Sequence, residues 1–136
     1  MSVPQRTTVL RRWALAAGLV CAGPGFAASI HSGPLPAIGG IGDRLECTVA
    51  NVDDKPIEEI RVRIRNVDFG TVVSDVSCAG TPPGGACPST FHVPGPALPS
   101  RFACSVDAKA KKDSLRGTFL RTSSTGQSDD LVVELR

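Results

Sequence analysis

The sequence predicts an all-β domain, an antiparallel β-sandwich of six or seven short strands stapled by disulfide bonds. From residue 45 onward, apolar and polar residues alternate with a period of two, which is typical of strands with one buried and one solvated face. Turn-forming residues separate these runs at nearly regular intervals, as in sandwiches. Four cysteines lie beyond residue 28. A small barrel with the same number of strands is the alternative.

Residues 1–27 have the three-part organisation of a secretory signal peptide. Three arginines lie between positions 6 and 12, an apolar run follows at 13–22, and Gly25-Phe26-Ala27 places small residues at a cleavage site. The apolar run is shorter than the roughly 20 residues that span a bilayer. We therefore expect a periplasmic or secreted protein whose mature chain begins at Ala28, without a transmembrane segment.

Two features of this segment leave its export route open. Arg11-Arg12-Trp13 resembles a twin-arginine signal. Cys21 is a candidate for lipidation, but Gly18-Leu19-Val20 before it lacks the leucine and the small residue of lipoprotein signals. We expect Cys21 to be discarded with the signal peptide.

Removing residues 1–27 leaves twelve basic and thirteen acidic residues, so the mature chain has a net charge near −1. This balance disfavours binding to nucleic acid or anionic lipid. The single tryptophan lies in the signal peptide and tyrosine is absent, which leaves four mature aromatic residues. We expect these to be core residues rather than stacking platforms for sugars or single strands: Phe69, Phe91, Phe102 and Phe119.

The elements follow in order along the mature chain. Residues 28–43 are rich in Gly and Pro and are interpreted as an extended, loosely attached leader. The sandwich domain spans 44–136, and its strands are expected at 45–50, 60–65, 71–77, 90–93, 102–108, 114–122 and 131–135. The run at 90–93 is short and is expected at an edge. Turns are expected at 51–56, 68–70 and 109–113, and no segment shows a helical period.

Four cysteines allow three pairings. Cys47 and Cys104 occupy matching frames, Leu-Glu-Cys-Thr-Val and Phe-Ala-Cys-Ser-Val, on the apolar phase of their strands. Their pairing would tie an early strand to a late one across the core. Cys78 and Cys87 would then close a Gly/Pro-rich loop. A thiolate zinc site is disfavoured because no two cysteines have the C-x₂₋₄-C spacing.

No catalytic constellation is visible, so we expect a non-enzymatic protein without a cofactor or metal. His31 lies in the leader and His92 in a strand without a motif, whereas a catalytic base needs a partner that orients it. Paired cysteines leave no thiol nucleophile. The acidic pairs Asp53-Asp54 and Asp129-Asp130 lack the Asp-x-Asp spacing of calcium loops and are interpreted as turn residues.

Two surface features are candidates for binding an unknown protein or envelope ligand. Arg61, Arg63 and Arg65 alternate with apolar residues and so project from one sheet face over roughly 13 Å. This row is either an anion site or, as we favour, a solvated face paired with acids on neighbouring strands. The other feature is the loop at 78–87, where a partner would contact Thr81, Pro82, Pro83, Gly84 and Gly85. We rank the loop first, with the arginines steering an acidic partner.

Four segments resemble a group of short exported bacterial proteins that have a single Ig-like β-sandwich. They are Leu45-Glu-Cys47-Thr-Val-Ala-Asn51-Val52, Phe102-Ala-Cys104-Ser-Val106, Ser114-Leu115-Arg116-Gly117 and Leu131-Val132-Val133. The resemblance covers residues 45–136 and implies an Ig-like fold and export, but no functional residue. The second cysteine pair, Cys78 and Cys87, departs from the pattern of that group.

These observations predict an exported, non-enzymatic binding or structural module. The alternative is an inhibitor or ligand-capture protein that presents the disulfide-closed loop at 78–87, since a constrained loop has little ordering entropy to lose on binding. A hydrolase is disfavoured because neither a base nor a nucleophile is identified.

Overall fold

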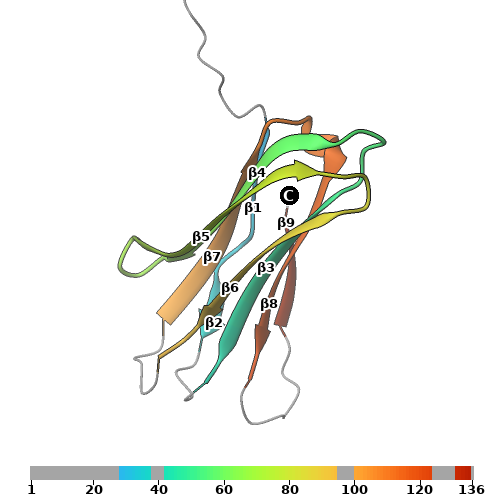
Figure 1. Ribbon diagram of the computed structural model, residues 1–136. Helices are drawn as coiled ribbons and strands as arrows, with labels where there is room; N and C mark the ends of the chain where they lie inside the picture. Colours follow the sequence, from blue (N-terminus) through green and yellow to red (C-terminus); the bar gives the residue numbers. More distant parts are fainter. Residues whose placement is uncertain (1–27, 38–41, 95–99, 124–130, 136) are drawn as a thin grey trace, which may run out of the picture.

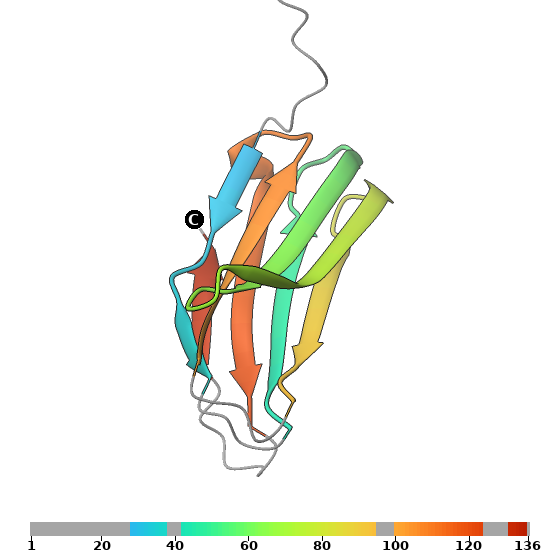
Figure 2. The ribbon, with the colours of Figure 1, turned by 90° about the vertical axis from the view of Figure 1, so that its left-hand side faces the viewer.

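The computed structural model describes residues 28–37, 42–94, 100–123 and 131–135, so the predicted signal peptide lies outside the described residues. These residues form two antiparallel sheets that pack face to face (Figures 1 and 2). The strands are β1 (Ala28–His31), β2 (Leu35–Ala37), β3 (Arg44–Asn51), β4 (Ile57–Asn66), β5 (Thr71–Thr81), β6 (Ala86–His92), β7 (Ser100–Ala108), β8 (Leu115–Thr122) and β9 (Leu131–Leu135), with one 3₁₀ turn at Lys112–Ser114.

One sheet, called sheet A below, has the strand order β1-β7-β4-β5, and β2 pairs with β7 beside β1. The other, sheet B, has the order β6-β3-β8-β9. The chain therefore crosses between the sheets from β2 to β3, from β3 to β4, from β5 to β6, and on each side of β7. Two separate sheets confirm the predicted sandwich architecture over a closed barrel.

The alternation of apolar and polar residues is confirmed on the central strands. Apolar side chains of both sheets point inward and form one core, because burying them removes apolar surface from water. The inward-facing residues on three of the four central strands include Leu45, Cys47 and Val49 on β3, Ile60, Val62 and Ile64 on β4, and Phe102, Cys104 and Val106 on β7. Phe119 on β8 is also fully buried.

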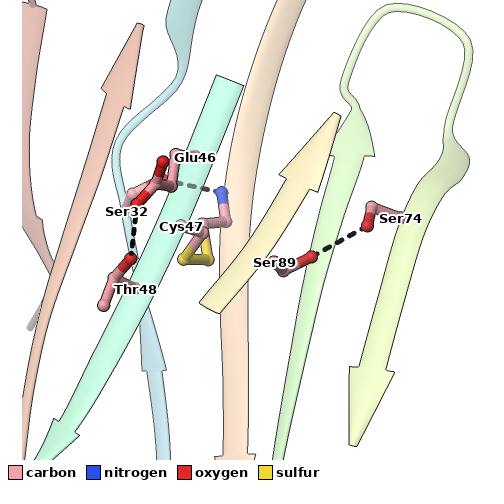
Figure 3. The surroundings of a disulfide bond; sticks show 7 residues. Ser32, Glu46, Cys47, Thr48, Ser74 and Ser89 are labelled. Atoms are coloured by element: carbon pink, nitrogen blue, oxygen red, sulfur yellow. Dashed lines mark hydrogen bonds between the residues drawn. A yellow bond between two sulfur atoms is a disulfide. The ribbon is translucent and has the colours of Figure 1, made fainter. Parts of the chain in front are cut away.

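Both predicted disulfides are confirmed. Cys47 on β3 is bonded to Cys104 on β7 (Figure 3), and this bond joins the two sheets through the core. Cys78 on β5 is bonded to Cys87 on β6.

The interpretation of 28–43 as a loosely attached leader is wrong for the residues that the structure describes. β1 and β2 both pair antiparallel with β7, and Ala28, Ile30 and Leu35 are buried in the core. Without them, β7 would expose a row of unpaired backbone groups and one side of the core. These two strands raise the number above the predicted six or seven, and the domain begins before residue 44.

The loop predicted at 78–87 is mostly strand. β5 continues to Thr81, which lies opposite Ile57 of β4, and β6 begins at Ala86, opposite Ala50 of β3. Only 82–85 forms a turn, and it carries the chain from sheet A to sheet B. The Cys78–Cys87 bond therefore joins the edge strands of the two sheets instead of closing a loop. Nearby, the hydroxyl oxygens of Ser74 and Ser89 lie 2.8 Å apart and link the same strands (Figure 3).

Asn51 is a buried polar residue that the sequence pattern did not single out. Its side-chain amide donates to the carbonyls of Lys55 (2.8 Å) and Thr81 (3.0 Å). Its backbone N–H donates to Gly85 O, and its carbonyl accepts from Gly84 N–H, both at 2.9 Å. Asn51 thereby fixes both the β3–β4 turn and the turn between the sheets.

We expect Asn51→Ala to lower the free energy of unfolding by about 2 kcal/mol. The substitution removes the amide donor and leaves the backbone carbonyls of Lys55 and Thr81 without its hydrogen bonds. Urea denaturation would measure this change. Asn66→Ala is the control, since Asn66 caps an exposed turn at the other end of β4. A cost no greater than that of the control would contradict the role assigned to Asn51.

Candidate functional site

The arginine row lies on the outer face of sheet A, where two of its members are paired with acids. Arg61 donates two hydrogen bonds to Asp75 of β5, from Nε to Oδ1 (2.9 Å) and from Nη2 to Oδ2 (2.6 Å). These bonds lower the pKa of Asp75 and raise the pKa of Arg61. Arg63 forms an ion pair with Asp107 of β7. The interpretation of the row as a paired, solvated face is confirmed for Arg61 and Arg63.

Arg65 differs from the other two members of the row. Its cross-strand neighbours are Val72 on β5 and Ala103 on β7, neither of which offers an acceptor side chain. Within the described part of the chain, no hydrogen bond or ion pair reaches its guanidinium group. The row contains three guanidinium groups and two carboxylate partners, so the surplus positive charge lies at Arg65.

A shallow hollow of about 240 Å³ lies beside Arg65. Its lining residues are His31, Ser32, Arg63, Arg65, Ala103, Cys104 and Ser105. The hollow lies where β1 ends and before β2 begins. There Ser32 N–H donates to Cys104 O (2.9 Å), and Cys104 N–H donates to Ser32 Oγ (2.8 Å). His31 was expected to lie in a loose leader, so its position beside the arginines was not predicted.

The β4–β5 hairpin ends in an apolar tip, defined here as residues 67–72, which projects from the body of the sandwich (Figure 1). Phe69 is 66% exposed, Val67 40% and Val72 44%. The prediction that Phe69 is a core residue is therefore wrong, whereas Phe91, Phe102 and Phe119 do pack in or against the core. The predicted turn at 68–70 is confirmed.

The tip is held rigidly despite its exposure. Asn66 Oδ1 accepts from the backbone N–H groups of Asp68 (3.0 Å) and Phe69 (3.2 Å). Gly70 adopts a φ of +67°, a conformation that side chains disfavour. Arg101 donates to both Asp68 oxygens, and these hydrogen bonds lower the pKa of the Asp68 carboxyl.

The turn that was ranked first as a binding site is compact and structural. Thr81 is buried, and Gly85 N–H donates to Pro82 O (2.8 Å). Pro82, Pro83 and Gly84 remain exposed, Gly85 is half-buried, and none of the four offers a charged or hydrogen-bonding side chain. The turn lies at the end of β5 opposite the tip, about 30 Å away along the strand. The structure therefore does not bring the turn together with Arg65.

The remaining residues that the sequence raised as candidates for chemistry are His92 and the two acidic pairs. His92 is exposed at the end of β6. The Ser114 hydroxyl donates to Asp53 (2.6 Å), and this bond is the main reason that the pKa of Asp53 is lowered to about 2. Asp53 lies in the predicted 51–56 turn, whereas Asp129-Asp130 lies outside the described residues.

The described part of the chain brings no three His, Cys, Asp or Glu side chains into a cluster that could ligate a metal ion. None of its segments forms an apolar helix of membrane-spanning length. A second hollow, of about 340 Å³, lies over β3, β8 and β9, and its two charged lining residues, Arg116 and Glu134, have opposite signs. Of these two hollows, the one on sheet A is therefore the one with surplus positive charge.

Comparisons of the chain with protein-family models, with curated proteins and with solved structures find no match.

Proposed function

We propose that the chain is an exported, non-enzymatic binding module, and that an acidic protein docks on Arg65 and the apolar tip at 67–72. The exposure of Phe69 on a rigid hairpin is the observation that carries the proposal. Aromatic side chains are frequent energetic anchors of protein interfaces. Because Asn66 and the Arg101–Asp68 pair already hold the turn, docking would cost little conformational entropy.

The acidic character of the partner follows from the charges beside the tip. Arg101 is neutralised by Asp68, whereas Arg65 has no counter-ion in the described part of the chain. A carboxylate on the partner would supply the missing acceptor, since the planar guanidinium group matches carboxylate geometry. Complementary charge of this kind mainly raises the rate of association and selects the partner.

Export and the Ig-like form of the sandwich belong to the same proposal. Export is supported by the signal-like organisation of residues 1–27 and by two disulfides, which form and persist in oxidising compartments. Cleavage after Ala27 would leave β1 intact from its first residue, Ala28. The Ig-like form is supported by the resemblance of the strands around Cys47 and Cys104.

The second candidate is ligand capture by the turn at 82–85. The observation that favours it is preorganisation, because buried Asn51 and the Cys78–Cys87 bond fix both sides of the turn. This candidate gives the binding role to Pro82 and Pro83 and none to Phe69.

Photo-crosslinking in the native envelope tests the proposal and separates the two candidates. A photoreactive phenylalanine analogue would replace Phe69, Pro83 or, as the control, Val52, which is 51% exposed at the opposite end of β4. We expect one discrete adduct at position 69, attached to a partner segment rich in Asp and Glu, and none at position 52. Arg65→Gln should abolish that adduct.

Phe69→Ser should reduce partner binding while changing the free energy of unfolding by less than about 0.5 kcal/mol, as for other exposed positions. An adduct at Pro83 with none at Phe69 would transfer the binding role to the turn. An adduct at Phe69 that survives Arg65→Gln would contradict the acidic docking proposed here.

A further inference from the structure

We infer that the hollow beside Arg65 is an oxyanion-binding site that takes a carboxylate or phosphate group. The inference rests on the proposed function, because it assigns to the docking face the chemical group that it recognises. Two guanidinium groups, one imidazole and two serines line the hollow. Arginine presents parallel N–H donors that bind both oxyanions in a bidentate manner.

The donors at this hollow have few competing acceptors. Arg65 has none within the described residues, and the Nε of Arg63 is buried without a hydrogen-bond partner. An unsatisfied buried donor is unfavourable, so the ion pair with Asp107 leaves one N–H group of Arg63 without an acceptor beside the hollow. One ring nitrogen of His31, Nε2, lies 3.1 Å from Ser29 Oγ, and the other, Nδ1, has no hydrogen-bond partner among the residues that the structure describes.

The acids on the same face do not neutralise Arg65. Asp75 bonds to Arg61 and Asp107 to Arg63. Both acids lie opposite residues earlier on β4 than Arg65, because Asp75 pairs in register with Arg63 and Asp107 with Arg61. Opposite Arg65 lie Val72 and Ala103, so an incoming oxyanion meets a cation flanked by uncharged side chains.

The strand break beside β7 makes room for the ligand. β1 and β2 both lie on the edge of β7, but no strand covers 32–34 between them. Ser32 turns its hydroxyl to the Cys104 backbone there, and the opening between β1 and β2 is where the hollow forms. The hollow is therefore bounded by backbone fixed to β7, which is itself joined to β3 by the Cys47–Cys104 bond.

The test uses the disulfide-bonded protein and two simple probes, inorganic phosphate and acetate, with sodium chloride at matched ionic strength as reference. Two-dimensional ¹H–¹⁵N NMR would follow the arginine Nε–H signals and the backbone amides of Ala103 and Ser105. We expect saturable shifts of Arg65 with at least one oxyanion at millimolar concentration, and none with chloride. Saturation by acetate points to an acidic side chain of a partner, and saturation by phosphate alone points to a phosphorylated group.

Arg65→Gln should weaken oxyanion binding at least tenfold, because glutamine keeps a polar side chain but removes the charge and the paired donors. Arg116→Gln is the matched control, since Arg116 is exposed on sheet B and, among the described residues, its side chain bonds to the backbone carbonyls of Asp113 and Leu115. Shifts that fail to saturate, that appear equally with chloride, or that survive Arg65→Gln would overturn the oxyanion site. These measurements need no protein partner. Oxyanion binding can therefore be absent when crosslinking at Phe69 is observed, and it can be observed when crosslinking at Phe69 is absent.

Discussion

Replacing Cys47 and Cys104 together with alanine should lower the free energy of unfolding by about 4 kcal/mol. The bond closes a sequence separation of 57 residues, and a cross-link over a segment of this length removes much of the entropy of the unfolded chain. Both cysteines are fully buried and lie on different sheets. Urea denaturation of the oxidised double variant and of the parent protein would measure the difference.

A loss of this size is a large fraction of the stability of a small domain, so partial unfolding at 37 °C is expected. Reducing agent should destabilise the parent protein more than the double substitution does, and should destabilise the double variant further, because it also breaks the Cys78–Cys87 bond. A double variant whose urea midpoint matches that of the parent would contradict the stabilising role assigned to this bond.

The core and this disulfide were predictable because strand periodicity is a local signal. Leu45, Cys47 and Val49 reveal one buried face within five residues, and Phe102, Cys104 and Val106 repeat the same pattern. Placing both cysteines on the apolar phase was enough to infer that they meet between two layers.

The strands β1 and β2 were not predictable because residues 28–43 are rich in Gly and Pro, a composition typical of unpaired segments. Their burial depends on the free edge of β7, which lies more than 60 residues later in the chain. Composition indicates how flexible an isolated segment is, whereas pairing depends on which edge is left open. Phe69 was misplaced for a related reason. The local sequence of a phenylalanine beside a glycine turn is the same whether its side chain packs into the core or projects into solvent.

Part of the candidate site was predictable from the sequence. The spacing of Arg61, Arg63 and Arg65 predicted that all three share a face, and they do. Which of them lacks a partner depends on register, because Asp75 and Asp107 come from strands on either side of β4. The contribution of His31 also required the pairing of β1 with β7. Such neighbours come from long-range pairing that no short motif encodes.

Replacing Cys78 and Cys87 together with alanine should lower the free energy of unfolding by about 3 kcal/mol, although the bond spans a sequence separation of only 9 residues. The sequence alone predicted that this bond closes a Gly/Pro-rich loop, so that its loss would affect mainly that loop. In the structure, Cys87 is fully buried and the bond joins the edge strands of sheets A and B. Its removal should therefore weaken the whole sandwich, not only the turn at 82–85.

Two measurements separate these outcomes. The urea midpoint should fall, and amide hydrogen exchange should rise along β5 and β6, including the residues around Ser74 and Ser89. Ser74→Ala is the control, since it removes only the hydroxyl contact between the same strands and should cost about 1 kcal/mol or less. If exchange rises only at 82–85 and the urea midpoint stays constant, the bond stabilises the turn alone. That result would favour the turn as a preorganised binding element.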